Sequence, residues 1–427
     1  MNLQMMNILS KKLQSFHSSK DYITLVSNFG YLSLLQVAGY IFPLITMPYL
    51  ARVIGPEGFG KLAFASAVVM WIQTISDWGF NYTATRDVAQ NRDDKDKVSR
   101  IFSNVLWARC FLTVFSSVIL TILVLVIPYL RENALVIYAT FFMVPGHVLF
   151  PEWFFQAIER MKYTTIFNLV LKFFFTIMIF FIVKEPDDYI WSPLLTSIGY
   201  VICGLGSLNL ILNSWGYKLY KPQLKEIYST ILRSTDVFIN NLMPNLYNSF
   251  SVMLLGFFSG VSANGIYDGG NKFPTIFYNL QGVISRTFYP FLSRRADKHK
   301  FFSFLYIGMS IIGAIILVIL SPLLINIFLG SQFSDSVSIM QILSVSIIFL
   351  AISNTYGTNY LILRHHEREL RNITIISSIV GMASAVPLVY YYDAIGVALT
   401  VAFSRFLLGF LSFVGFIKIE RKKSFLI

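Results

Sequence analysis

Long apolar segments recur along this whole chain, with only short polar connections between them. A helix needs about 20 mostly apolar residues to cross a bilayer, and only helices and closed barrels satisfy their backbone hydrogen bonds inside lipid. The segments show no period-two alternation of the kind that barrel strands require. The sequence therefore predicts an all-α polytopic membrane protein with about twelve transmembrane helices. The predicted spans are 25–50, 61–83, 101–127, 134–156, 164–183, 190–212, 234–258, 265–290, 301–328, 337–362, 373–391 and 395–417.

The composition excludes a soluble globular protein. Of the 427 residues, 55% are hydrophobic and 13% are charged, whereas soluble domains carry about 25% charged residues. The formal net charge is +12, but the basic residues fall in short clusters between the apolar segments. This pattern is typical of loops on the cytoplasmic side of a membrane. We therefore expect membrane lipid as a partner and no nucleic acid.

The distribution of Lys and Arg predicts the orientation of the chain. When the N-terminus is placed inside, the inside connections hold 25 of these residues and the outside connections hold 4. Basic residues favour the cytoplasmic side, so both termini are expected there. Residues 1–20 lack an unbroken apolar core and a cleavage site, which predicts a cytoplasmic arm and not a signal peptide.

The two halves of the chain share an order of features. Pro43 lies twelve residues before Gly55, and Pro244 lies twelve residues before Gly256. Each glycine is followed by a glycine-containing outside turn, an apolar segment with polar residues and a charged inside loop. We therefore predict two pseudo-symmetric six-helix lobes with the substrate site between them. The predicted units are an N-terminal lobe over 1–214, a cytoplasmic linker over 215–233 and a C-terminal lobe over 234–427.

Five basic residues lie within the predicted spans, namely Arg109, Lys172, Lys272, Arg286 and Arg405. A charge near the centre of a bilayer costs about 2.5–3.5 kcal/mol, so such residues face a wet cavity, pair with a partner or extend to the interface. Arg109 and Arg286 lie near the inside edge, where extension to the interface and a cavity role are both open. Lys172 and Arg405 lie near the middle of their spans, which predicts that they face a cavity.

Acidic residues in or beside the spans are candidates for binding a coupling ion. Asp268 and Lys272 are four residues apart, so they share a helix face and can pair. The pair either neutralises the helix for insertion or forms a charged patch in a cavity, where Asp268 binds a proton. Asp77 and Glu152 are the candidates in the first half, and Glu152 follows a helix-breaking cluster of proline and glycine. We interpret His147, within that cluster, as a hydrogen-bonded interior residue.

No motif in the sequence indicates an enzyme, a cofactor or a metal site. The chain has no Gly-rich P-loop, no HExxH and no GxSxG, so we predict that it is not an enzyme. His365, His366 and Glu367 lie together in a basic connection, where we interpret them as solvated side chains and not as metal ligands. Cys110 and Cys203 lie in apolar segments and are interpreted as small buried residues without a disulfide.

Two stretches resemble bacterial O-antigen flippases of the multidrug/oligosaccharidyl-lipid/polysaccharide exporter superfamily. The first is RVIGPEGFGKLAF, followed by SDWGFNYTATRDVAQ, and the second is LGFFSGVSANGIYDGGNKF, followed by ISRTFYPFLSRR. The resemblance covers nearly the whole chain, including the number and orientation of the helices. It is uninformative about which sugar is carried.

The resemblance implies a V-shaped bundle of two lobes around a cationic cavity. It implies that the chain moves an undecaprenyl-pyrophosphate-linked oligosaccharide across the bacterial inner membrane by alternating access, with an ion gradient as a candidate energy source. A polysaccharide polymerase and a chain-length regulator are the implied protein partners. By their positions in the matching motifs, the resemblance implies a role in lining the cavity for Arg52, Asp77, Asn81, Arg86, Asp268 and Lys272. Lys172, Arg286 and Arg405 join the predicted cavity set from their places in apolar spans.

Three alternatives stay open at this point, and one of them is an additional role as a passive scaffold for the glycan assembly complex. A multidrug or cation antiporter of the same superfamily predicts an acidic cavity, whereas the charge surplus here is basic. A membrane polysaccharide polymerase predicts a sizeable outside loop with catalytic basic residues, and every predicted outside connection is short. We therefore favour the flippase.

Overall fold

The structure of this protein is a computed structural model that describes residues 20–364 and 366–424. Within these residues the regular secondary structure is helical, without strands, so the predicted all-α class is confirmed. The described part of the chain has 9 helical stretches that are long and apolar enough to cross a membrane, which makes it a multi-pass membrane protein. The predicted cytoplasmic arm lies outside the described residues, except for Lys20 at the start of α2.

Three long helices are each interrupted by one residue with a left-handed backbone. These are α2 (Lys20–Asp77) at Gly55 with φ 62°, α12 (Ser249–Arg294) at Gly260 with φ 80°, and α15 (Glu367–Ser424) at Asp393 with φ 48°. Glycine adopts such angles readily because it has no Cβ. Each break falls between two of the predicted spans, although the predicted span 234–258 is itself divided among α11, η3 and the start of α12.

The remaining helices are shorter. The α-helices are α3 (Phe80–Ala89), α4 (Lys95–Val126), α5 (Pro128–Glu132), α6 (Ala134–Phe141), α7 (Met143–Leu149), α8 (Glu152–Ala157), α9 (Met161–Ile182), α10 (Trp191–Asn209), α11 (Leu224–Leu242), α13 (His299–Phe328) and α14 (Ser336–Ser353). The 3₁₀ and π segments are η1 (Pro186–Ile190), η2 (Leu210–Ser214), η3 (Met243–Leu246), η4 (Ala296–Lys298), η5 (Ser331–Phe333), η6 (Asn354–Leu361) and η7 (Ile362–Arg364). The predicted span 134–156 is thus divided into α6, α7 and α8, and Pro151, which lacks the N–H that a continuous helix needs, lies at the break between α7 and α8.

A glycine break occurs in each half, and the second one lies four residues after Gly256. The Pro–Gly spacing predicts Gly256 as the counterpart of Gly55, whereas the second break lies at Gly260. Gly256 stays inside the helix and packs against Phe64, where an added Cβ would lie 2.5 Å from the aromatic ring. The second break therefore lies one helical turn after the glycine that the Pro–Gly spacing pairs with Gly55.

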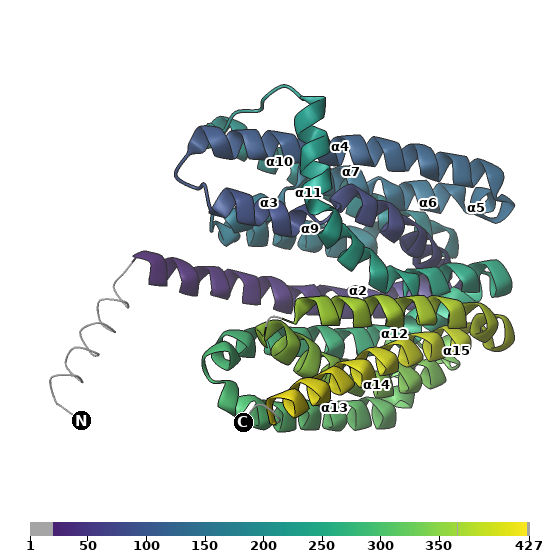
Figure 1. Ribbon diagram of the computed structural model, residues 1–427. Coiled ribbons are helices and arrows are strands. Elements are labelled where there is room, and N and C mark those ends of the chain that lie inside the picture. Colours follow the sequence, from purple (N-terminus) through teal and green to yellow (C-terminus); the bar gives the residue numbers. More distant parts are fainter. Residues whose placement is uncertain (1–19, 365, 425–427) are drawn as a thin grey trace.

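The helices form two groups with α2 between them (Figure 1). Helices α3 to α10 lie on one side in blue and teal, α12 to α15 lie on the other in green and yellow, and α11 runs from the first group toward the second. One buried cluster, rich in aromatic residues such as Phe102 and Trp153, holds the first group together. Another cluster, which includes Phe59 of α2 and Phe333 of η5, joins the two groups. The start of α2 and the end of α15 lie at the same side of the bundle (Figure 1).

Candidate functional site between the two helix groups

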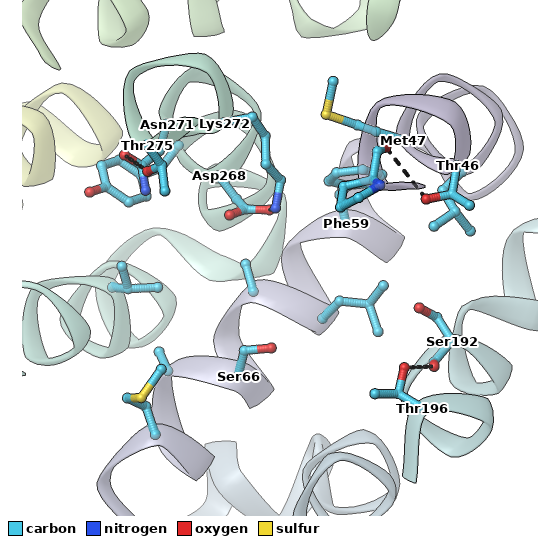
Figure 2. Close-up of a pocket in the computed structure, with 18 of the residues that line it drawn as sticks. Thr46, Met47, Phe59, Ser66, Ser192, Thr196, Asp268, Asn271, Lys272 and Thr275 are labelled. Carbon is cyan, nitrogen blue, oxygen red and sulfur yellow. Dashed lines mark hydrogen bonds and ion pairs between the residues drawn. The ribbon is translucent and has the colours of Figure 1, made fainter. Parts of the chain in front are cut away.

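A cavity of about 720 Å³ lies between the two helix groups. Its walls come from α2, α9, α10 and α12, together with Arg405 of α15. Figure 2 shows side chains from these helices around an open space, with Asp268 and Lys272 across it from Ser192 and Thr196. The neutral polar residues of the wall include Thr46, Ser66, Ser192, Thr196, Asn248, Asn271, Thr275 and Asn279. Hydroxyl and amide groups of this kind suit a ligand that is itself rich in hydroxyl groups.

The predicted pair of Asp268 and Lys272 forms on the α12 wall. The Lys272 ammonium lies 2.6 Å from the Asp268 carboxylate, and the two side chains are 37% and 26% exposed. The ammonium also lies 5.8 Å from the centre of the Phe59 ring. Because both side chains reach the cavity, the pair is a neutralised but accessible patch in its wall.

Lys172 and Arg405 bring positive charge to the cavity from opposite helix groups. Lys172 is half-buried on α9, and Arg405 is 9% exposed on α15. The guanidinium of Arg405 donates a hydrogen bond of 2.9 Å to Ser346 Oγ and lies 5.8 Å from the centre of the Tyr278 ring. No described carboxylate forms an ion pair with either residue. The cavity therefore combines two cations that form no ion pair with a described carboxylate and one neutralised pair.

The polar face of α12 extends further than the sequence reasoning recognised. Asn271, Thr275 and Asn279 line the cavity beside Asp268. They follow Asp268 at intervals of three, seven and eleven residues, which places all of them on one side of a helix. This spacing is a signal in the sequence that the search for charged residues missed.

Asp77 and Arg109 form an ion pair inside the first helix group, away from the residues that line the cavity. Their side chains are 23% and 3% exposed. Extension of Arg109 to the interface, which was one of its two open interpretations, is therefore wrong. The ring of His147 stacks on Tyr200 at 4.3 Å between centroids, and Tyr200 lines the cavity.

Glu152 lies behind the cavity wall. Its Oε1 accepts a hydrogen bond of 2.6 Å from Asn168 Nδ2, and Asn168 also donates to the Thr164 carbonyl oxygen at 3.0 Å. The Glu152 carboxylate interacts electrostatically with Lys172. An acidic residue is thus linked to one of the two cavity cations through the interior of the first group.

The other predicted site residues lie outside the cavity walls. Arg52 is exposed and donates to the Ile327 carbonyl oxygen at 3.1 Å. Arg86 pairs with its neighbour Asp87 at 3.3 Å, and Arg286 donates to a carbonyl oxygen of its own helix. Asn81 is exposed on α3. A role in substrate binding for these residues, and for Asp77, stays a prediction.

A charged cavity between two groups of membrane-spanning helices is the architecture of a membrane transporter. Residues 25–296 match the profile of the family described as "Polysaccharide biosynthesis protein". The match covers more than half of the chain, and the chain belongs to this family. The resemblance predicted from the two sequence stretches is confirmed.

Two relatives carry the name "Putative O-antigen transporter". The protein from Escherichia coli (strain K12) is 26% identical over 386 residues, which cover 88% of this chain and 93% of that protein. The protein from Shigella dysenteriae is 28% identical over 385 residues, which cover 88% of this chain and 96% of that protein. Both names are those of transporters, in agreement with the prediction that the chain is not an enzyme.

Solved structures of transporters share the fold. One is an inward-facing multidrug resistance MATE family transporter of the MOP superfamily, with a TM-score of 0.70 and 13% identity, covering 93% of this chain and 98% of that chain. Another is the lipid II flippase MurJ in an inward closed conformation, with a TM-score of 0.69 and 13% identity, covering 91% of this chain and 87% of that chain. At this identity the likeness establishes the fold alone.

Proposed function

We propose that this protein is a flippase for an undecaprenyl-pyrophosphate-linked polysaccharide repeat unit, which it moves from the cytoplasmic to the periplasmic leaflet of a bacterial inner membrane. The observation that carries this proposal is the cavity, whose wall holds Lys172 from one helix group and Arg405 from the other, neither in an ion pair with a described carboxylate. Relatives named as O-antigen transporters and the fold shared with a lipid II flippase support it.

The proposed topology has twelve spans in two six-helix lobes. Dividing α2, α12 and α15 at their breaks separates three pairs of predicted spans, which is the basis for twelve. The N-terminal lobe takes 1–214, the linker 215–233 and the C-terminal lobe 234–427, with both termini in the cytoplasm. The count of basic residues supports this orientation, and the shared side of the two described chain ends agrees with it.

In the proposed mechanism, fixed cations replace part of the water that the diphosphate loses. Arginine and lysine form strong charge-assisted hydrogen bonds with phosphate oxygens, so Lys172 and Arg405 hold the diphosphate from two lobes. The hydroxyl and amide groups of α10 and α12 meet the sugars, and the lipid tail remains in the membrane. Two cations bind the head group weakly enough for release on the other side.

The remaining predicted residues take supporting roles in this proposal. Arg52, Asn81, Arg86 and Arg286 mark the two ends of the path, where the head group enters and leaves. Glu152, Asp77 and Asp268 are the ion-coupling candidates, and Glu152 interacts with the cavity cation Lys172. A polysaccharide polymerase and a chain-length regulator stay the expected partners.

The alternatives have less support. A cation antiporter needs a cavity that attracts cations, whereas the charged wall here consists of Lys172, Lys272 and Arg405 with only Asp268 against them. A polymerase is a different class of protein from the transporters that share this fold.

The proposal is tested by transport of a defined lipid-diphosphate oligosaccharide in proteoliposomes, with and without a proton gradient. We expect transport by the unmodified protein and a loss of about tenfold or more in Lys172→Ala and Arg405→Ala, because each removes a hydrogen bond to a charged group. Lys162→Ala is the matched control, because Lys162 is exposed on the same helix as Lys172. Absence of transport by the unmodified protein, or full transport by both cavity variants, would contradict the proposal.

A further inference from the structure

The two broken helices α2 and α12 touch backbone to backbone just after their breaks. A Cβ added to Gly60 would lie 1.6 Å from the carbonyl oxygen of Val261, and a Cβ added to Gly265 would lie 1.9 Å from the carbonyl oxygen of Pro56. Pro56 and Val261 are each the first residue after a break. The contact is therefore reciprocal, and only glycine fits at position 60 or 265 while it is closed. We call the segments 56–60 and 261–265 the outer seam.

The outer seam closes one end of the cavity. Phe59, next to Gly60, and Tyr267, two residues after Gly265, both line the cavity. A third segment supports the closure, since Gln332 Nε2 donates a hydrogen bond of 2.6 Å to the Ala51 carbonyl oxygen. In the proposed orientation this end of the molecule faces the periplasm.

A polar side chain inside the seam lacks hydrogen bonds. Asn264 is 0% exposed, and neither its Nδ2 nor its Oδ1 has a hydrogen-bond partner within the described part of the chain. A buried polar group without a partner is costly, because it has lost its bonds to water. The position that a Cβ of Gly256 would occupy lies 2.5 Å from the Phe64 ring of α2 and 2.9 Å from Asn264 Nδ2, so separation of α2 from α12 is expected to give this amide access to water. The closed seam thus contains a penalty that opening removes.

The glycine contact also lets the two helices separate cleanly. Small residues allow close approach of membrane helices, and a backbone contact at Gly60 and Gly265 involves no interlocked side chains at these two positions. The contact is close enough that even one added methyl group prevents it. This is the behaviour expected of a two-state element.

We propose that the outer seam is the periplasmic gate of the transport path, closed in this structure, and that Asn264 limits the stability of the closed gate. The inference rests on the proposed function, because alternating access requires the two ends of the cavity to open in turn. The two features act in opposite directions. The glycines permit closure, and the unpaired amide of Asn264 favours opening.

The gate is tested by measuring distances between spin labels in the full-length protein in lipid, after replacement of Cys110 and Cys203 by alanine. One label pair, Glu57→Cys and Ser262→Cys, uses exposed positions within the two segments of the seam. The other pair, Tyr82→Cys and Thr287→Cys, uses exposed positions of α3 and α12 toward the opposite end. We expect the short distance to dominate at the seam in the otherwise unmodified protein.

Gly60→Ala is expected to replace the short seam distance with a longer one and to shorten the distance at the opposite end. Gly39→Ala is its matched control, because Gly39 lies in the same helix and an added Cβ there meets nothing within 4 Å. The control should leave both distances unchanged. An unchanged seam distance in Gly60→Ala would overturn the proposal.

Asn264→Ala tests the proposal in the opposite direction, because this variant is expected to favour the closed seam. A variant that failed to fold would not give this result. Removal of the unpaired amide is expected to raise the ratio of closed to open seam by about tenfold and to slow transport. A lower ratio, or an unchanged one, would overturn the role of Asn264. If the label distances respond as expected while the unmodified protein transports no lipid-linked oligosaccharide, the seam stands and the proposed function fails.

Discussion

Arg109 of α4 and Asp77 at the C-terminal end of α2 form an ion pair inside the first helix group, with the Arg109 side chain only 3% exposed. The Nε of Arg109 has no hydrogen-bond partner among the described residues, so the carboxylate is the main compensation for the buried charge. Removing one partner of such a pair is far more costly than removing both, because it leaves an isolated charge out of water. The pair therefore joins α2 to α4 as one unit.

Single substitutions of this pair are expected to destabilise the protein. Arg109→Met and Asp77→Asn should each lower the free energy of unfolding by about 3–5 kcal/mol, because each leaves the other charge unpaired. The double variant Arg109→Met/Asp77→Asn should recover most of the loss. Thermal unfolding of the purified proteins measures this difference. A double variant no more stable than the worse single variant would show that the two residues act independently.

A substitution at Glu152 can separate a structural role from an ion-coupling role. Glu152→Gln keeps an oxygen that accepts the hydrogen bond from Asn168, but this oxygen does not titrate. We expect normal abundance and a loss of the dependence of transport on the proton gradient. In contrast, Asn168→Ala removes the hydrogen bond and should lower stability by about 1–3 kcal/mol. Transport by Glu152→Gln with its gradient dependence intact would exclude Glu152 as the coupling residue.

The helical fold was open to prediction because lipid leaves the backbone no other way to satisfy its hydrogen bonds. The position of a break inside a long helix could not be predicted in this way. Gly256 and Gly260 lie one turn apart on α12, and both are free of a Cβ. In the structure Gly256 packs tightly against Phe64 inside the helix, and the positive φ falls at Gly260. That contact comes from the other half of the chain, so no local pattern reveals it.

The same distinction applies to the charged residues. The mid-span positions of Lys172 and Arg405 indicate that each charge needs a wet or polar environment, and the structure places both in the cavity wall. Arg109 gives a similar signal from its sequence, yet its partner Asp77 lies on another helix. Composition and position therefore identify charges that need compensation. The tertiary structure decides whether a carboxylate or the cavity provides it.

Asp268 is expected to hold Lys272 away from the substrate. Asp268→Asn removes the negative charge 2.6 Å from the Lys272 ammonium and leaves the cation free. The two side chains are partly exposed, and exposed pairs contribute about 0.2–1 kcal/mol. Binding of a lipid-linked diphosphate, measured without an ion gradient, should therefore tighten by about twofold to fivefold, and turnover should slow. Asp268→Glu keeps the charge and serves as the control. Weaker binding by Asp268→Asn would indicate that the carboxylate itself contacts the substrate.

Ser346 is expected to position Arg405. Its Oγ accepts the 2.9 Å hydrogen bond from the guanidinium, and both residues are buried, so Ser346→Ala leaves Arg405 without this support. We expect Ser346→Ala to weaken binding of the lipid-linked diphosphate by about three- to tenfold. Ser344→Ala is the matched control, because Ser344 is buried on the same helix and, among the described residues, donates its hydrogen bond to the carbonyl oxygen of Met340. In an Arg405→Ala background, Ser346→Ala should have no further effect on binding. A further loss in that background would mean that Ser346 acts on the substrate or the fold directly and not through Arg405.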